Sequence, residues 1–109
     1  MANTHKRFFS RRNSPANGLR EVREMEVLYQ TCVGLDVHAK TVVACLTHHD
    51  RKQVRTFSTM TDDLLALSNW LVASGCQQVA MESTGVYWKP VFNLLEGVVP
   101  VILVNAQYV

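Results

Sequence analysis

Short apolar segments with β-strand character come first in this chain, and helical periodicity begins only after them. Thr31–Asp36 and Thr41–Thr47 are rich in β-branched and other apolar residues, and Val54–Ser58 alternates apolar with polar side chains. The polar stretch 48–52 has turn character. Three strands joined by tight turns are typical of an antiparallel meander, so the fold is predicted to begin as a sheet.

A single amphipathic helix is predicted after this meander. Thr61–Asp63 places a hydroxyl that can cap the helix and two carboxylates at its positive end. Gly75 is a natural helix stop. The helix is interpreted as structural and packed on a sheet, because apolar residues form a broad stripe at helical spacing: Leu64, Leu65, Leu67, Trp70, Leu71 and Val72.

The remaining segments alternate strand and helix. Gln78–Glu82 is predicted as a short strand and 86–96 as a helix, with Pro90 either in its first turn or at a kink. Val101–Val104 is a continuous apolar run, which is typical of a parallel strand buried on both faces. The predicted order is βββαβαβ, an α/β fold with a mixed sheet.

Length and composition agree with one globular domain and exclude several classes. The chain has 109 residues, 48% of them hydrophobic and 18% charged, an ordinary globular balance. No apolar run approaches the roughly 20 residues that span a bilayer, so no membrane association is expected. Cys32, Cys45 and Cys76 form no C-x-x-C pair. They are therefore interpreted as buried apolar side chains, and neither a zinc site nor a disulfide framework is predicted.

The basic character of the chain lies in its N-terminal segment. Residues 1–26 carry six Lys or Arg and three Glu, whereas residues 27–109 carry five basic and six acidic residues. Residues 1–26 are predicted to be a flexible basic tail and 27–109 the folded domain, because the tail composition buries little apolar surface. Three interpretations stay open: a solvated tail without a role, an arm that binds phosphate weakly, or sequence translated ahead of a natural start at Met25.

Two carboxylates stand at the ends of predicted strands. Asp36 ends the first strand and Glu82 ends the fourth. Right-handed crossovers bring later parallel strands beside the first, so both side chains are expected at one edge of the sheet, where open α/β sheets bind ligands. Adjacent carboxylates repel unless they share a proton or a cation, and Mg²⁺ prefers oxygen ligands, so a Mg²⁺ site for phosphodiester chemistry is predicted. Taken singly, Asp36 could instead bond to a turn and Glu82 to a helix start.

Aromatic and basic side chains follow Glu82. Tyr87 and Lys89 are candidates for contact with a nucleic-acid strand, whereas Trp88 is expected in the core. Alternatively, Tyr87 packs its ring at the helix start. The histidines at or near the predicted hairpin are interpreted as exposed turn residues rather than a metal cluster: His38, His48 and His49.

Three stretches of the sequence closely resemble one protein family. Gly34-Leu-Asp-Val-His-Ala-Lys40 is followed by a Val-rich strand, then by Met81-Glu-Ser-Thr-Gly-Val-Tyr-Trp-Lys89 and by Val104-Asn-Ala-Gln107. These stretches resemble the N-terminal domain of the DEDD transposases of the one-ten family of insertion sequences. That family includes pilin-gene invertases and bridge-RNA-guided recombinases. The likeness runs from about Val27 to the end of the chain.

The resemblance implies a ribonuclease-H-like (RuvC-like) fold and a function in DNA transposition and recombination. It implies that Asp36 and Glu82 match the first two acids of the family's Asp-Glu-Asp-Asp set and act with Mg²⁺. Family members act as oligomers on element-end and target DNA, and many carry a structured guide RNA. They also use a serine nucleophile in a separate C-terminal domain. A bacterial, cytoplasmic location is therefore expected.

The sequence departs from the family pattern in one respect. The last two aspartates of the family follow the Val-Asn-Ala-Gln stretch, and residues 1–109 contain neither these aspartates nor the serine domain. The chain is therefore expected to be a truncated domain, with a sheet incomplete at its C-terminus, and to be inactive alone. The alternative is a non-catalytic module that binds nucleic acid or a full-length transposase. A sugar-kinase-like ATP-binding fold is disfavoured because no Gly-rich phosphate loop is visible.

Overall fold

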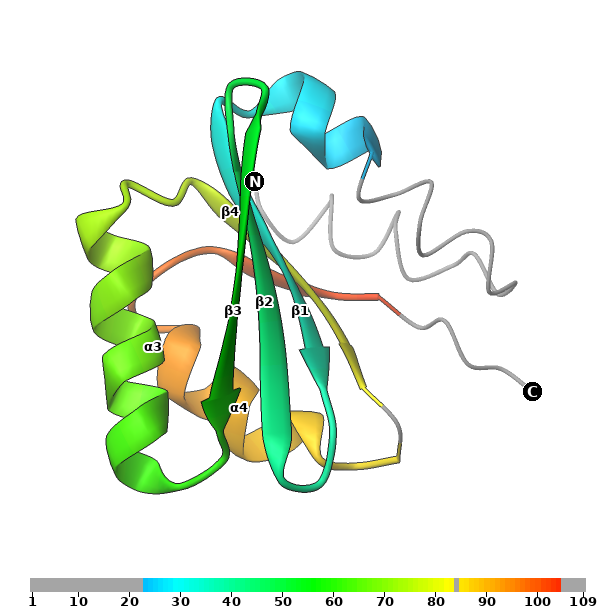
Figure 1. The fold of residues 1–109 in the computed structure, drawn as a ribbon. Helices are drawn as coiled ribbons and strands as arrows, with labels where there is room; N and C mark the ends of the chain where they lie inside the picture. Colours follow the sequence, from blue (N-terminus) through cyan, green and yellow to red (C-terminus); the bar gives the residue numbers. More distant parts are fainter. Residues whose placement is uncertain (1–22, 84, 105–109) are drawn as a thin grey trace.

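A computed structural model describes residues 23–83 and 85–104 of the chain. Residues 23–28 are helical, and Met25 within them is buried. Residues 1–22 of the predicted tail lie outside the described residues. None of the described helices is long and apolar enough to cross a membrane. The elements that follow confirm the predicted order βββαβαβ (Figure 1): β1 (Thr31–Val37), β2 (Thr41–His48), β3 (Arg51–Ser58), α3 (Thr61–Ala73), β4 (Gln78–Ser83), α4 (Trp88–Leu95) and β5 (Val101–Leu103).

The five strands form one mixed sheet in the order β3-β2-β1-β4-β5. β1, β2 and β3 pair antiparallel, which is the predicted meander. β4 pairs parallel with β1, and β5 pairs parallel with β4. The connections through α3 and α4 therefore place β1 and β4 side by side inside the sheet, with their carboxyl ends at the same edge.

The two long helices cover one face of the sheet (Figure 1). Alternate residues of β1, namely Val33, Leu35 and Val37, share one core with Leu67 of α3 and Leu95 of α4, and all five are buried. Side chains at the intervening positions point to the opposite face, because successive strand residues alternate. A smaller buried cluster lies on that second face and consists of Met25, Cys32, Ala80, Ile102 and Val104.

The starts of the two helices differ in how well the sequence predicted them. α3 has Met60 as its N-cap and no side-chain cap, so Thr61 is the first helical residue and not the predicted cap. Asp63 ties this end to the sheet instead: its Oδ2 accepts a hydrogen bond of 2.9 Å from the Ser58 backbone N–H. Pro90 lies in the first turn of α4 and not at a kink, since its missing N–H costs nothing there.

Gly75 ends α3, as predicted. Its φ of 72° is the left-handed conformation that glycine adopts without steric cost. The Gly75 N–H donates to the Val72 carbonyl at 3.1 Å, and the Cys76 N–H donates to the Leu71 carbonyl at 3.0 Å. These two bonds form a Schellman motif, which satisfies carbonyl groups that a helix end leaves without intrahelical partners.

The three cysteines are free thiols. Cys32 is buried, whereas Cys45 and Cys76 are half-buried, so the predicted burial is complete only for Cys32. Burial raises the pKa of the Cys32 thiol to about 11, and it does the same for Cys76. Both thiols therefore stay protonated near neutral pH, which suits them to packing roles and makes them poor nucleophiles.

Candidate functional site

Asp36 and Glu82 lie directly opposite each other on neighbouring parallel strands. Each is the second-last residue of its strand, and the two are register partners in the β1–β4 pairing. The preceding register pair, Leu35 and Met81, is buried in the core beneath the helices. Because strand residues alternate, both carboxylates lie on the face of the sheet opposite to α3 and α4. The structure thus brings together the two acids that the sequence placed at strand ends.

The two carboxylates have unequal surroundings. The Asp36 side chain is 57% exposed, whereas Glu82 is half-buried at the same edge. Burial, and secondly the negative charge of Asp36, raise the pKa of the Glu82 carboxyl above its usual value. Both effects penalise the ionised form of Glu82. A bound cation would offset this penalty.

His38 is an additional neighbour of the acid pair. Its Nε2 lies 3.1 Å from Oδ2 of Asp36, and 44% of its side chain is exposed. The His38 backbone N–H donates to the Thr41 carbonyl at 2.8 Å, which holds the tight link between β1 and β2. The sequence analysis treated His38 only as an exposed turn residue and missed this contact. The spacing of two residues between Asp36 and His38 could have revealed this contact, because residues two apart in an extended chain share one face.

Tyr87 and Lys89 lie at the start of α4, close in sequence to Glu82. Tyr87 is the N-cap residue and is 47% exposed, and Lys89 is exposed with its Nζ 6.0 Å from the Trp88 ring centroid. Trp88 packs partly buried against the main core, as expected. Tyr87 also borders a hollow of about 330 Å³, whose other lining residues are Ala39, Thr59, Leu64, Val86, Pro90 and Val91.

The acid pair fits a hard divalent cation, although few other ligands accompany it. Within residues 23–83 and 85–104, no group of three or more His, Cys, Asp or Glu side chains is placed to hold a metal ion. Mg²⁺ commonly takes only one or two carboxylates and completes its shell with water and substrate phosphates. Asp36 and Glu82 therefore provide a donor set suited to Mg²⁺ and unsuited to a metal that needs an all-protein cage.

The fold resembles that of solved structures. A Bacteroides thetaiotaomicron protein with an actin-like ATPase fold and unknown function matches with a TM-score of 0.57 and 14% sequence identity. The match covers 88% of this chain and 41% of that protein, and at this identity it concerns the fold alone. Together with the five-stranded mixed sheet, it confirms the predicted α/β fold of the ribonuclease-H-like class.

Sequence comparison gives the family. A family model of transposases, the DEDD transposases of the IS110 type, matches residues 33–109. The match covers more than half of the chain, and the chain belongs to this transposase family. Asp36 and Glu82 both lie within the matched residues. A search of curated proteins found no match.

Proposed function

We propose that this chain is part of a DNA transposase in which Asp36 and Glu82 hold Mg²⁺ at the phosphodiester bond that is cut or joined. The observation that carries the proposal is the pairing of Asp36 with Glu82 across β1 and β4. Two carboxylates in register at the carboxyl edge of a parallel pair form an oxygen-rich site where open α/β sheets bind ligands. The partners proposed for this site are element-end and target DNA.

The surrounding residues would prepare the acid pair for the ion. Mg²⁺, when bound, would stabilise negative charge on the attacking and leaving oxygens of a phosphodiester. Asp36 offers an exposed carboxylate, and His38 restrains its Oδ2 by a contact of 3.1 Å. Glu82 would be held ionised by the cation despite its burial. Tyr87 and Lys89, at the start of α4, would contact the nucleic-acid strand by stacking and by charge.

The polypeptide of residues 1–109 carries two of the four acids that the family resemblance implies. We therefore propose that this polypeptide binds Mg²⁺ weakly and does not cut or exchange strands alone. Assembly into oligomers and association with a structured guide RNA belong to the same proposal, since the resemblance implies both for family members.

A magnesium titration tests the site without requiring catalysis. Carboxyl carbon resonances of Asp36 and Glu82 should shift together as Mg²⁺ is added to the 1–109 chain. Asp36→Asn should weaken binding about tenfold or more, because it removes one of two charged ligands. Asp62→Asn is the matched control, since Asp62 lies in the first turn of α3 and should leave the titration unchanged. Equal loss in both variants, or no shift at either carboxyl, would contradict the metal site.

A strand-cleavage assay tests the expected lack of activity. The 1–109 chain, incubated with element-end DNA and Mg²⁺, should give no cleavage or exchange products. Reproducible products that disappear in Asp36→Ala would contradict this part of the proposal while supporting the metal site.

A non-catalytic binding module is the second candidate function. It is favoured by the small number of acids that come together, since no third His, Cys, Asp or Glu of the described residues joins the pair in a metal-binding group. Such a module would bind nucleic acid or a full-length relative without Mg²⁺. Co-purification with an intact transposase, unaffected by Asp36→Asn, would support this function over the metal-dependent one.

A further inference from the structure

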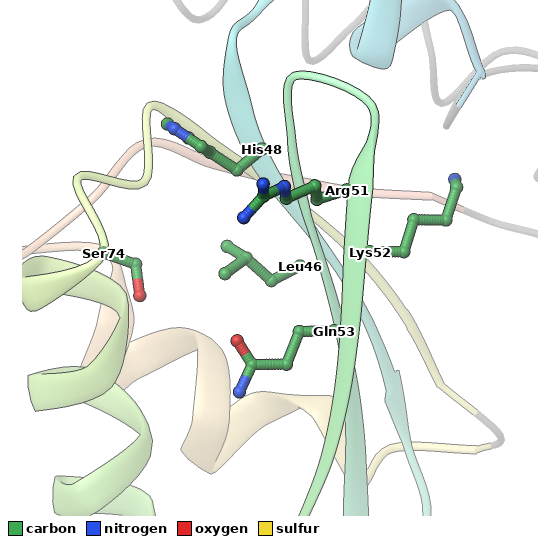
Figure 2. A pocket seen from close by; sticks show the side chains of 6 residues that line it. All are labelled: Leu46, His48, Arg51, Lys52, Gln53 and Ser74. Atoms are coloured by element: carbon green, nitrogen blue, oxygen red, sulfur yellow. The ribbon is translucent and has the colours of Figure 1, made fainter.

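A second hollow, lined by several polar side chains, lies at the far end of the central strands, beside the β2–β3 hairpin. Its volume is about 520 Å³, and Figure 2 shows its lining residues Leu46, His48, Arg51, Lys52, Gln53 and Ser74. His48 pairs with Thr31 at the start of β1, whereas Asp36 lies five residues further along that strand. At about 3.4 Å per strand residue, this separation is roughly 17 Å. The hollow is therefore distinct from the acid pair.

The charge of this hollow is positive. None of its lining residues is acidic, and Arg51 makes no ion pair with any described carboxylate. In Figure 2 the Arg51 guanidinium extends from the hairpin toward the side where Ser74 lies, and Lys52 points the other way. Lys52 is already paired, because its Nζ lies 3.0 Å from Oε2 of Glu26. Arg51 is thus the cation that the hollow offers to a ligand.

Other hydrogen-bonding side chains line the hollow beside Arg51. His48 Nδ1 lies 2.6 Å from the hydroxyl of Thr31, which is buried, so the imidazole ring is held in place. If that hydroxyl donates to Nδ1, the Nε2–H of His48 is a donor directed away from Thr31. Gln53 adds an amide and Ser74 a hydroxyl, both of which can donate to an anion.

Arg51 is not needed to stabilise the nearby end of α3. A cation close to a helix C-terminus could stabilise the negative end of the helix dipole, and α3 has no basic residue in its last turn. The carbonyls of Leu71 and Val72, however, already accept hydrogen bonds from Cys76 and Gly75. Since this end is capped by the backbone, the guanidinium remains available for another partner.

We infer that this hollow binds a phosphate group of a nucleic-acid strand, with Arg51 as its charged ligand. A guanidinium flanked by neutral donors matches the planar, bidentate recognition of phosphate. A polyanion is favoured over a small phosphate because positive charge continues along the edge strand. Arg55 lies on the same face of β3 as Arg51, and none of the eight residues of this strand is acidic. The phosphate site needs no Mg²⁺, so it is independent of the metal site proposed above.

A binding assay with matched charge variants tests the inference. The 1–109 chain is titrated into fluorescein-labelled single-stranded DNA, and separately RNA, at low ionic strength. Arg51→Gln should raise Kd about tenfold and reduce the slope of log K against log salt by about one, since one phosphate contact is lost. Lys40→Gln removes the same charge from an exposed residue in the link between β1 and β2, at the opposite end of the sheet, and it should change Kd less than about twofold. Circular dichroism of both variants checks that the fold is kept.

Amide chemical shifts give a second readout that does not depend on the variants. Oligonucleotide should shift the amides of His48, Arg51, Gln53 and Ser74. Equal losses in Arg51→Gln and Lys40→Gln, or no binding by the parent chain, would overturn the inference. Inorganic phosphate alone producing the same shifts, with no tighter binding by oligonucleotide, would overturn the choice of a nucleic acid. The titrations are run with EDTA and without Mg²⁺, so failure of the metal site would leave this result unaffected.

Discussion

At the scale of single residues, the acid pair is a place where the fold carries a local electrostatic cost. Burial and the charge of Asp36 both raise the pKa of Glu82 in the folded state. The unfolded chain lacks these surroundings, so in the window between the unfolded and folded pKa values the native state binds more protons. Stability therefore falls as pH rises through this window, and the cost is absent below the unfolded pKa.

Replacing Glu82 by Gln should remove this cost. We expect Glu82→Gln to raise the free energy of unfolding at pH 7 by on the order of 0.5 kcal/mol, a small value because water screens a part-exposed carboxylate. The advantage should disappear as pH falls below the usual glutamate range. Urea unfolding of parent and variant across pH measures it. Asp50→Asn, in the hairpin turn at the other end of the sheet, is the control, because it removes a carboxylate that does not act on Glu82.

Residue-level contacts were also where prediction from sequence was weakest. Asp36 and Glu82 were found because strand ends and the handedness of crossovers are readable from the chain. The contact of His38 with Asp36 depends on the conformation of the short link after β1, which apolar patterning does not encode. The hollow around Arg51 depends on where α3 ends relative to the hairpin. That relation is set by packing and not by local sequence.

At the scale of elements, hydrophobic periodicity predicted the five strands, α3, α4 and their order. These segments bury one face each, so their spacing of apolar residues is constrained by the core. The cap of α3 was predicted wrongly, because the helix begins at Thr61 with Met60 as N-cap and has no side-chain cap. Here Asp63, reaching back to Ser58, links helix and sheet in place of a cap from Thr61. The helix stop at Gly75 was predicted correctly, since only a left-handed residue closes the Schellman motif without strain.

The helix end provides a matched test of backbone conformation. A Cβ at Gly75 or at Gly97 would meet no atom within 4 Å, so neither position is limited by space. Gly75 has a φ of 72°, and Gly75→Ala should therefore lower the stability by about 1 kcal/mol or more. Gly97, which lacks a positive φ, should tolerate Ala within about 0.5 kcal/mol. Urea midpoints of the two variants decide the question, and equal losses would show that φ is not the cause.

At the scale of the whole molecule, the sheet separates two regions of opposite charge. The acid pair stands at the carboxyl edge of β1 and β4, and the hollow around Arg51 stands at the other end of β1. A nucleic-acid strand held by phosphate at the basic end would be kept near the molecule while a second segment approached the acid pair. The two proposed sites would therefore support one overall function through different chemistry, one with Mg²⁺ and one without it.

The proposed metal site would also couple Mg²⁺ binding to folding of the entire domain. Asp36 and Glu82 are 46 residues apart in the sequence and meet only when β1 and β4 pair, so the unfolded chain has no such site. Mg²⁺ at ten times its Kd should stabilise the native state by about 1.4 kcal/mol. In a domain of this size, each kcal/mol of stabilisation raises Tm by roughly 4–8 °C, so Mg²⁺ binding should give a measurable rise.

Thermal unfolding with and without Mg²⁺ measures this coupling. Asp36→Asn should lose the rise in Tm, whereas Arg51→Gln should keep it, because Arg51 lies outside the metal site. Without Mg²⁺, Glu82→Gln should be more stable than the parent chain. With Mg²⁺, its Tm should rise less than that of the parent chain. A rise in Tm that survives both Asp36→Asn and Glu82→Gln would place the ion elsewhere and remove the physical basis for assigning these two carboxylates to phosphodiester chemistry.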